Sequence, residues 1–180
     1  MRTRPATLAL AVLALTASCT GSSGKPQVLP SLTATPSATA TPVVVPSAAT
    51  VHDSFGAVAF VRFYYAQLNL AYSMADASPL AGLADPECGT CKSYDQAMSD
   101  LRTKGERIQG DSIAIVSAEA RPEENGYVAV DLFFFVPARR VADASGKVLK
   151  SLPRDKQVHK LVYVKHVAAG WLMRAVKDAK

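Results

Sequence analysis

The stretch DSFGAVAFVRFYYAQLNLAYSMAD, residues 53–76, decides the fold. Arg62 is its only charge between the two flanking aspartates, and apolar or aromatic residues point in nearly every helical direction. A helix of about 24 residues that is apolar on most sides requires other parts of the chain to cover it. As a membrane span it fails, because Arg62, Gln67 and Asn69 would lie in the middle of the bilayer. We therefore expect the central helix of a globular domain, with Asp53 as its N-cap.

Two apolar stripes run along this predicted helix. One consists of Phe55, Ala59, Phe63, Ala66 and Leu70, and the other of Phe60, Tyr64, Leu68 and Tyr72. The tyrosines favour the rim of a packed core, where each hydroxyl reaches a polar partner, and a ligand-binding wall is the alternative. We expect Arg62 to form a structural ion pair with Asp131 or Asp76.

Two further helices are predicted after the first. Ser78 and Pro79 are typical of an N-cap followed by proline at the first helical position, which opens a short helix reaching Leu83. Apolar residues then recur at helical spacing from Cys91 to about Thr103, so we expect a second long helix that ends near Gly105.

From residue 112 onwards the apolar period changes from that of a helix to that of a strand. We expect strands at residues 112–121, 127–136, 158–168 and 171–176, with a more polar excursion between the second and the third. Glu124-Asn125-Gly126 is a hairpin signal. Helices followed by strands indicate an α+β domain, in which N-terminal helices pack on a curved antiparallel sheet of about four strands.

This order of elements, ending in GWLMR at residues 170–174, resembles the cone-shaped fold of the nuclear transport factor 2-like superfamily. Residues 60–94, FVRFYYAQLNLAYSMADASPLAGLADPECGTCKSY, more narrowly resemble a family of actinobacterial lipoproteins of unknown function. The resemblance covers about residues 52–178. It implies the fold and a location in the cell envelope, but no activity, because the superfamily includes isomerases, dehydratases and non-catalytic modules.

Residues 1–18 are predicted to be an export signal. Arg2 and Arg4 precede the short apolar run LALAVLAL at residues 8–15, which suits a signal peptide and is too short to span a bilayer. The sequence LTASC ending at Cys19 resembles the bacterial lipoprotein box, although threonine stands where leucine is usual. We therefore expect Cys19 to be acylated and the protein to be anchored at the outer face of the cell membrane. The alternative is an ordinary secretory signal followed by a free cysteine.

Residues 19–51 are predicted to form the lipidated cysteine and a disordered tether rich in threonine, serine, alanine and proline. Such a segment cannot bury enough apolar surface to offset its ordering entropy. Fully extended, roughly 30 residues reach on the order of 90 Å. Val43-Val44-Val45 is either a local contact or the start of the folded domain, which we place at residues 52–180.

Cys88-Gly-Thr-Cys91 is the one constellation with chemistry of its own. We expect a structural disulfide, because exported proteins live in an oxidising compartment. The alternative is a redox dithiol at a helix N-terminus, although the strand that precedes such a motif in thioredoxins is missing. A zinc site is disfavoured, because it would need two more ligands. No other metal site and no cofactor is predicted.

A cone-shaped fold usually encloses a pocket between its helices and its sheet. Six residues are candidates for its wall: Arg62, Tyr64, Tyr72, Asp131, His159 and Trp171. Strand parity places His159 and His166 on opposite faces, so at most one of them can enter the pocket. An Asp131–histidine pair across neighbouring strands would permit proton transfer. A small-molecule enzyme is therefore one of the alternatives for the function.

The charge pattern disfavours nucleic acid as a partner. The formal net charge is +5, and it includes Arg2 and Arg4 of the predicted signal. No basic run with interleaved aromatic residues is present. The sequence therefore predicts a non-catalytic binding module of the cell envelope, whose partner is an envelope protein or a hydrophobic ligand. Its alternatives are the thiol–disulfide oxidoreductase and the small-molecule enzyme.

Overall fold

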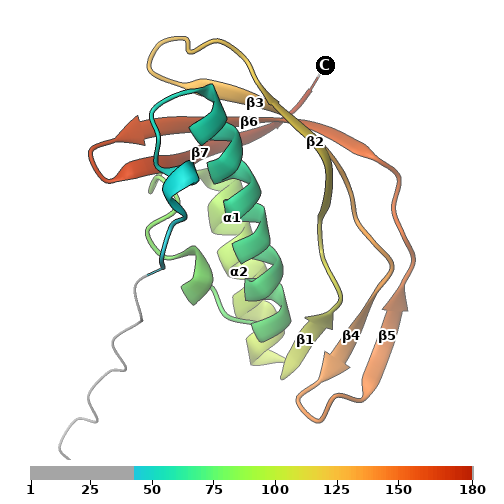
Figure 1. The fold of residues 1–180 in the computed structure, drawn as a ribbon. Helices are drawn as coiled ribbons and strands as arrows, with labels where there is room; N and C mark the ends of the chain where they lie inside the picture. The colour runs from blue at the N-terminus through green and yellow to red at the C-terminus, as the bar shows by residue number, and fades with distance from the viewer. Residues whose placement is uncertain (1–42, 180) are drawn as a thin grey trace, which may run out of the picture. The chain divides into compact units, whose positions relative to one another are not determined.

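Two long helices and two antiparallel sheets make up the fold in this computed structural model, which describes residues 43–179 (Figure 1). The helices are α1 (Ser54–Met74) and α2 (Gly89–Thr103), and two short 3-10 helices are η1 (Ser47–Ala49) and η2 (Ser78–Leu80). Each of the two long helices packs on strands of both sheets.

The larger sheet has the strand order β2-β3-β6-β7. Its strands are β2 (Ala114–Ala120), β3 (Val128–Phe135), β6 (Val158–Val167) and β7 (Gly170–Asp178). These are the four strands that the sequence predicts. The predicted α+β class, with helices packed on an antiparallel sheet, is confirmed.

A second sheet, of order β1-β4-β5, was not predicted. It consists of β1 (Glu106–Gln109), β4 (Arg139–Asp143) and β5 (Val148–Leu152). These strands are four or five residues long, and β5 is largely exposed, so they lack the alternation of buried and exposed residues that marks a strand in a sequence. The region expected to be a polar excursion is in fact a β-hairpin.

Local sequence explains where α1 begins and ends. Asp53 Oδ1 accepts a hydrogen bond of 2.7 Å from the backbone N–H of Gly56, as expected of an N-cap. Gly56 is required, because a Cβ there would lie 1.9 Å from the carbonyl oxygen of Val51. The helix ends at Ala75, whose left-handed φ of 52° stops the helical path.

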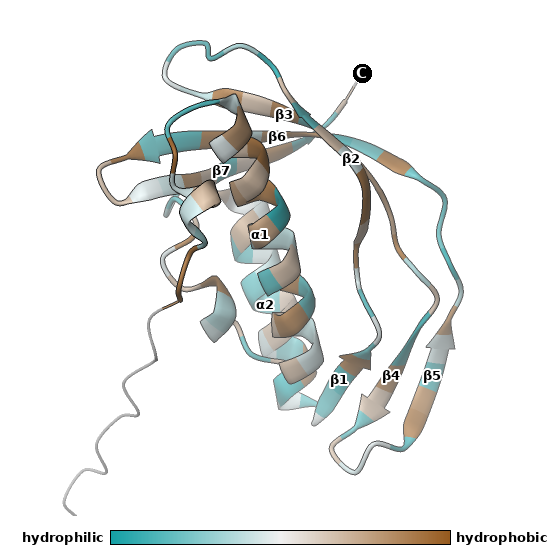
Figure 2. Ribbon diagram, viewed as in Figure 1, coloured by the Kyte–Doolittle hydropathy of each residue, from teal (hydrophilic) through white to brown (hydrophobic). Residues whose placement is uncertain are grey.

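Other parts of the chain cover most of helix α1, as expected, but one stripe of the helix stays exposed. Its buried residues include Phe60, Tyr64 and Leu68, whereas Phe55 is 83% exposed and Leu70 is 45% exposed. In Figure 2, α1 carries more of the hydrophobic colour than α2. The sheets supply one apolar surface, so the stripe that begins at Phe55 stays partly in contact with solvent.

The prediction that Arg62 forms an ion pair with Asp131 or Asp76 was wrong. Asp131 binds Arg121, with a distance of 2.6 Å from Nε to Oδ2, and Asp76 binds Arg102 at 3.2 Å. Arg62 is exposed on α1. Each of the two carboxylates binds another arginine instead of Arg62. The order of residues along the chain did not reveal these pairs.

Residues 43–51, which the sequence assigned to the tether, lie against the domain. Ala49 is buried, and the Trp171 indole donates a hydrogen bond of 2.8 Å to the carbonyl of Val51. The rings of His52 and His166 stack with their centroids 4.1 Å apart. The predicted signal, Cys19 and most of the tether lie outside the described residues. Among residues 43–179, no helix is both long enough and apolar enough to cross a membrane.

Asn69, in the middle of α1, binds the backbone that connects the two sheets. Its Oδ1 accepts hydrogen bonds from the N–H groups of Ser112 (3.0 Å) and Ile113 (2.9 Å), and its Nδ2 donates to the carbonyl of Ile113 (2.8 Å). This segment joins β1 of one sheet to β2 of the other. This polar side chain in a largely apolar helix therefore holds the junction of the two sheets.

We expect Asn69→Ala to lower the free energy of unfolding by about 2–4 kcal/mol, because three hydrogen bonds are lost and two part-buried backbone N–H groups lose their partner. Urea denaturation measures this change. Ser73→Ala is the matched control on the same helix: its exposed hydroxyl binds only the carbonyl of Leu70, so its effect should stay within about 0.5 kcal/mol. Equal effects of the two substitutions would contradict the role of Asn69.

Candidate functional site

A cavity of about 280 Å³ lies where α1, α2 and the two sheets meet. Its wall combines aromatic, aliphatic and polar side chains: Tyr72, Tyr94, Ile108, Ser112, Ile113, Phe134, Val136 and Arg139. Both helices and strands β1, β3 and β4 contribute to it. The second sheet, through Ile108 and Arg139, thus supplies part of the wall.

Polar atoms without partners distinguish this cavity from two larger hollows, although all three are open to solvent to a similar degree. Four buried side-chain atoms of the described residues have no hydrogen-bond partner: the hydroxyls of Tyr64 and Tyr65, Ser112 Oγ and Arg139 Nη1. Ser112 and Arg139 line the cavity, and none of the four lines the hollows of about 580 Å³ and 500 Å³. An unpaired buried polar group costs roughly 1–3 kcal/mol, so such groups call for an explanation.

The tyrosines around the cavity are neutral hydrogen-bond donors. Burial is the main cause that raises the pKa of Tyr72 and of Tyr94, and the positive charge of Arg139 opposes part of the rise at Tyr72. Burial also raises the pKa of Tyr64 and Tyr65, and the nearby Tyr94 adds to both rises. All four phenols therefore keep their protons at neutral pH and do not act as bases.

The backbone of this wall is positioned by Asn69. The N–H groups that it binds belong to Ser112 and Ile113, both of which line the cavity. Ser112 is only 8% exposed. No motif in the sequence marked Ser112 or Arg139, and the one available signal was a lone asparagine in the middle of an apolar helix.

The six residues predicted to line a pocket do not converge. Tyr72 lines the cavity, whereas Tyr64 is buried close to it. Trp171 binds the N-terminal segment, and Arg62 is exposed. Asp131 and His159 form a pair elsewhere: alternate residues of β3 (Val128, Val130, Leu132, Phe134) are buried, so Asp131 points to the opposite, outer face of the sheet.

On that outer face Asp131 is the centre of an ion-pair network. Its Oδ1 lies 2.8 Å from His159 Nε2, and both carboxylate oxygens bind the guanidinium of Arg121. The bond from Arg121, followed by that from His159, lowers the pKa of Asp131 to about 2, so the carboxylate stays ionised. Within residues 43–179 neither Asp131 nor His159 hydrogen-bonds a serine, threonine or cysteine side chain. The geometry favours cross-strand stabilisation.

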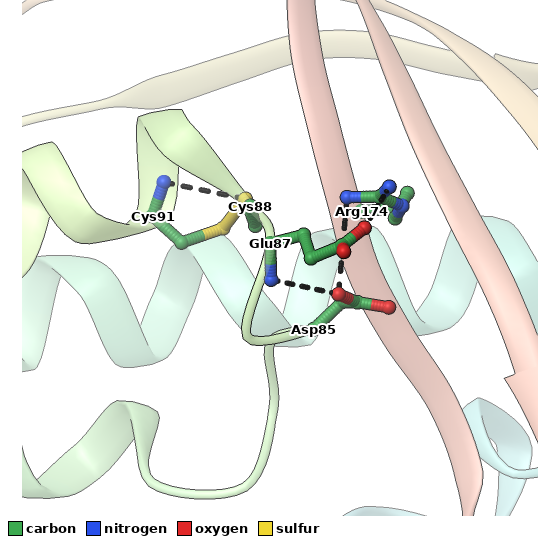
Figure 3. Close-up of polar contacts among 5 residues, drawn as sticks. All are labelled: Asp85, Glu87, Cys88, Cys91 and Arg174. Atoms are coloured by element: carbon green, nitrogen blue, oxygen red, sulfur yellow. Dashed lines mark hydrogen bonds and ion pairs between the residues drawn. A yellow bond between two sulfur atoms is a disulfide. The ribbon is translucent and has the colours of Figure 1, made fainter.

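Cys88 and Cys91 form a disulfide at the start of α2. Cys88 is the N-cap, and its sulfur accepts a hydrogen bond from the N–H of Cys91 at 3.2 Å (Figure 3). The preceding loop is held to β7 by Arg174, whose Nη2 lies 2.5 Å from Glu87 Oε2 and whose Nη1 lies 3.8 Å from Asp85 (Figure 3). The bridge therefore closes a turn that ion pairs attach to the sheet.

Both cysteines are buried, which favours a structural bond. Cys88 is 0% exposed and Cys91 is 4% exposed. Thiol–disulfide exchange requires an attacking thiolate to reach one of the two sulfurs. A hollow of about 580 Å³ lies beside the bridge, but the residues themselves present almost no surface to it. Among the described residues, no three histidine, cysteine, aspartate or glutamate side chains gather closely enough to hold a metal ion.

We expect the Cys88–Cys91 bond to resist a thiol reductant while the domain is folded, and to be reduced much faster in denaturant, because unfolding exposes the sulfurs. Quenched alkylation followed by mass spectrometry measures both rates. Replacing both cysteines by serine should lower the free energy of unfolding by about 2 kcal/mol, as the chain-entropy model gives for so small a loop. Reduction of the native protein as fast as that of a small exposed disulfide would support the redox hypothesis instead.

A family model described as a family of unknown function, DUF6318, matches residues 33–177. No curated protein matches the chain. This match confirms the predicted resemblance to a family of unknown function.

Among solved structures, the intermembrane space region of the chloroplast protein ARC6 is 12% identical, with a TM-score of 0.51; the match covers 72% of this chain and 99% of that chain. A protein of unknown function with a cystatin-like fold from Nostoc punctiforme is 8% identical, at a TM-score of 0.41, over 66% of this chain and 86% of its own. A putative dehydratase from the NTF2-like family of Streptomyces avermitilis is 12% identical, at 0.39, over 69% and 97%. At these identities the similarity concerns the fold alone.

Proposed function

We propose that this chain, which belongs to DUF6318, a family of unknown function, is a non-catalytic ligand-binding module of the cell envelope. The observation that carries this proposal is the cavity of about 280 Å³ with unpartnered polar atoms on its wall. Small-molecule sites characteristically combine an apolar wall with a few placed polar groups.

The composition of the cavity supports binding rather than catalysis. Its wall contains no histidine, cysteine, aspartate or glutamate, the residues that most often transfer protons or attack substrates. Its tyrosines are held neutral by burial. Ser112 Oγ has no hydrogen-bond partner among the described residues, and therefore no base to activate it. These groups suit recognition of a ligand.

The proposed location rests on residues 1–51. The predicted signal, the lipoprotein-like cysteine at Cys19 and the proline-rich tether together support export and a lipid anchor at the outer face of the membrane. The disulfide agrees with an oxidising compartment. The resemblance to actinobacterial lipoproteins points the same way. The partner would be a small, partly hydrophobic ligand of the envelope or a protein that delivers one.

Mass spectrometry of the protein from its native membrane tests the anchor. We expect the mature chain to begin at Cys19 with acyl groups attached, and a Cys19→Ala variant to appear in the soluble fraction. A mature chain with an unmodified Cys19 thiol would exclude the lipid anchor while leaving the proposal for the cavity intact.

Blocking the cavity tests the binding function. We expect the neutral fluorophore 1-aminonaphthalene to bind the full-length chain, with increased emission, and Ile113→Trp to weaken this binding at least about tenfold because the larger ring fills the cavity. Val116→Trp is the matched control, since Val116 is exposed three residues further along and lies outside the cavity wall. Equal binding by the two variants would refute the cavity as the site, and so would an absence of binding to the unmodified chain.

A further inference from the structure

Arg139 differs from the arginines that hold the rest of the domain together. Arg102, Arg121 and Arg174 each bind a carboxylate within 4 Å. Within residues 43–179 no carboxylate lies that close to Arg139, and its Nη1 is buried without a hydrogen-bond partner. Arg139 as a whole is half-buried, so the cost falls on this one donor, which loses its hydrogen bonds to water and gains none in return.

The cavity wall around Arg139 contains hydroxyl groups but no carboxylate. No aspartate or glutamate lines the cavity, whereas three residues that carry hydroxyl groups do: Ser112, Tyr72 and Tyr94. Arg139 is near enough to Tyr72 for its charge to lower the pKa of that phenol against the larger effect of burial. A guanidinium, a free serine hydroxyl and neutral phenols are the groups that bind a carboxylate in proteins.

The rest of the wall is largely apolar. Ile108, Ile113 and Phe134 belong to β1, to the link between the sheets and to β3. Ile108 and Phe134 are almost fully buried, at 7% and 8% exposed. A ligand that satisfies both parts of the wall needs a charged end and an apolar body.

We propose that the cavity binds a small organic carboxylate, with its anionic end on Arg139 and Ser112 and its apolar body against Ile108, Ile113 and Phe134. This inference rests on the proposed binding function and adds the chemical class of the ligand. The cavity volume of about 280 Å³ suits a short-chain or single-ring acid.

Paired probes of equal shape test the charge requirement. Benzoate and benzamide differ in charge but hardly in size, and titration of each into the full-length chain, followed by two-dimensional NMR, measures both affinities. We expect benzoate to bind at least about tenfold more tightly than benzamide, because only the acid forms a charge-assisted bond to Arg139. Resonances of Ser112 and Tyr94 should shift with benzoate.

Arg139→Gln should remove most of this preference, reducing benzoate affinity about tenfold or more while benzamide affinity changes little. Arg140→Gln is the matched control, because Arg140 is an exposed arginine one residue along β4 and lies outside the cavity wall. The affinity of the Arg140→Gln variant for benzoate should equal that of the unmodified chain. Since Arg139 is half-buried and forms no ion pair with a described residue, we expect the Arg139→Gln variant to fold, and circular dichroism checks this.

Several outcomes would overturn the proposal. Equal affinity of the unmodified chain for benzoate and benzamide would refute the anionic ligand while leaving the cavity as a binding site. Equal loss of benzoate affinity in the Arg139 and Arg140 variants would assign the effect to general surface charge. If inorganic phosphate competes with benzoate at similar concentrations, the cavity binds simple anions in general, and the proposed preference for an organic carboxylate is wrong. If neither benzoate nor 1-aminonaphthalene binds, the proposed binding function itself fails.

Discussion

The three hydrogen bonds of Asn69 are the interaction on which the arrangement of this domain depends. They join the middle of α1 to the backbone of Ser112 and Ile113, where the chain leaves β1 and enters β2. The larger sheet already packs on α1 through buried apolar residues, and such contacts have no direction. Hydrogen bonds do have direction, so Asn69 holds the start of the smaller sheet at one level of the helix.

The cavity follows from that placement. With the link between the sheets bound to α1, strands β1 and β4 bring Ile108 and Arg139 to the same space as Tyr72 and Phe134. Most buried polar groups in proteins have hydrogen-bond partners, so a wall that carries two buried polar atoms without one, on Ser112 and Arg139, is unusual. The same junction therefore determines both the fold and the candidate site.

The other polar interactions fasten the edges of the domain and explain why several predicted site residues have structural roles. Asp131 holds neighbouring strands through Arg121 and His159, and Trp171 binds the segment that precedes α1. The buried disulfide closes the turn before α2. The sequence marked Asp131, His159, Trp171 and the two cysteines as candidates for a functional site, and each of them already has a partner in the folded chain.

The sequence by itself determined the α+β class, the two long helices, the four strands of the larger sheet and the turn at Asn125-Gly126, whose positive φ angles of 53° and 77° suit a type I′ hairpin. These features depend on local periodicity and turn chemistry. Only the tertiary structure decided that β1, β4 and β5 pair, that Asp131 faces outward, and that Arg139 and Ser112 line one cavity. The physical reason is that these outcomes depend on contacts between distant segments, and short polar strands carry no periodic signal of their partners.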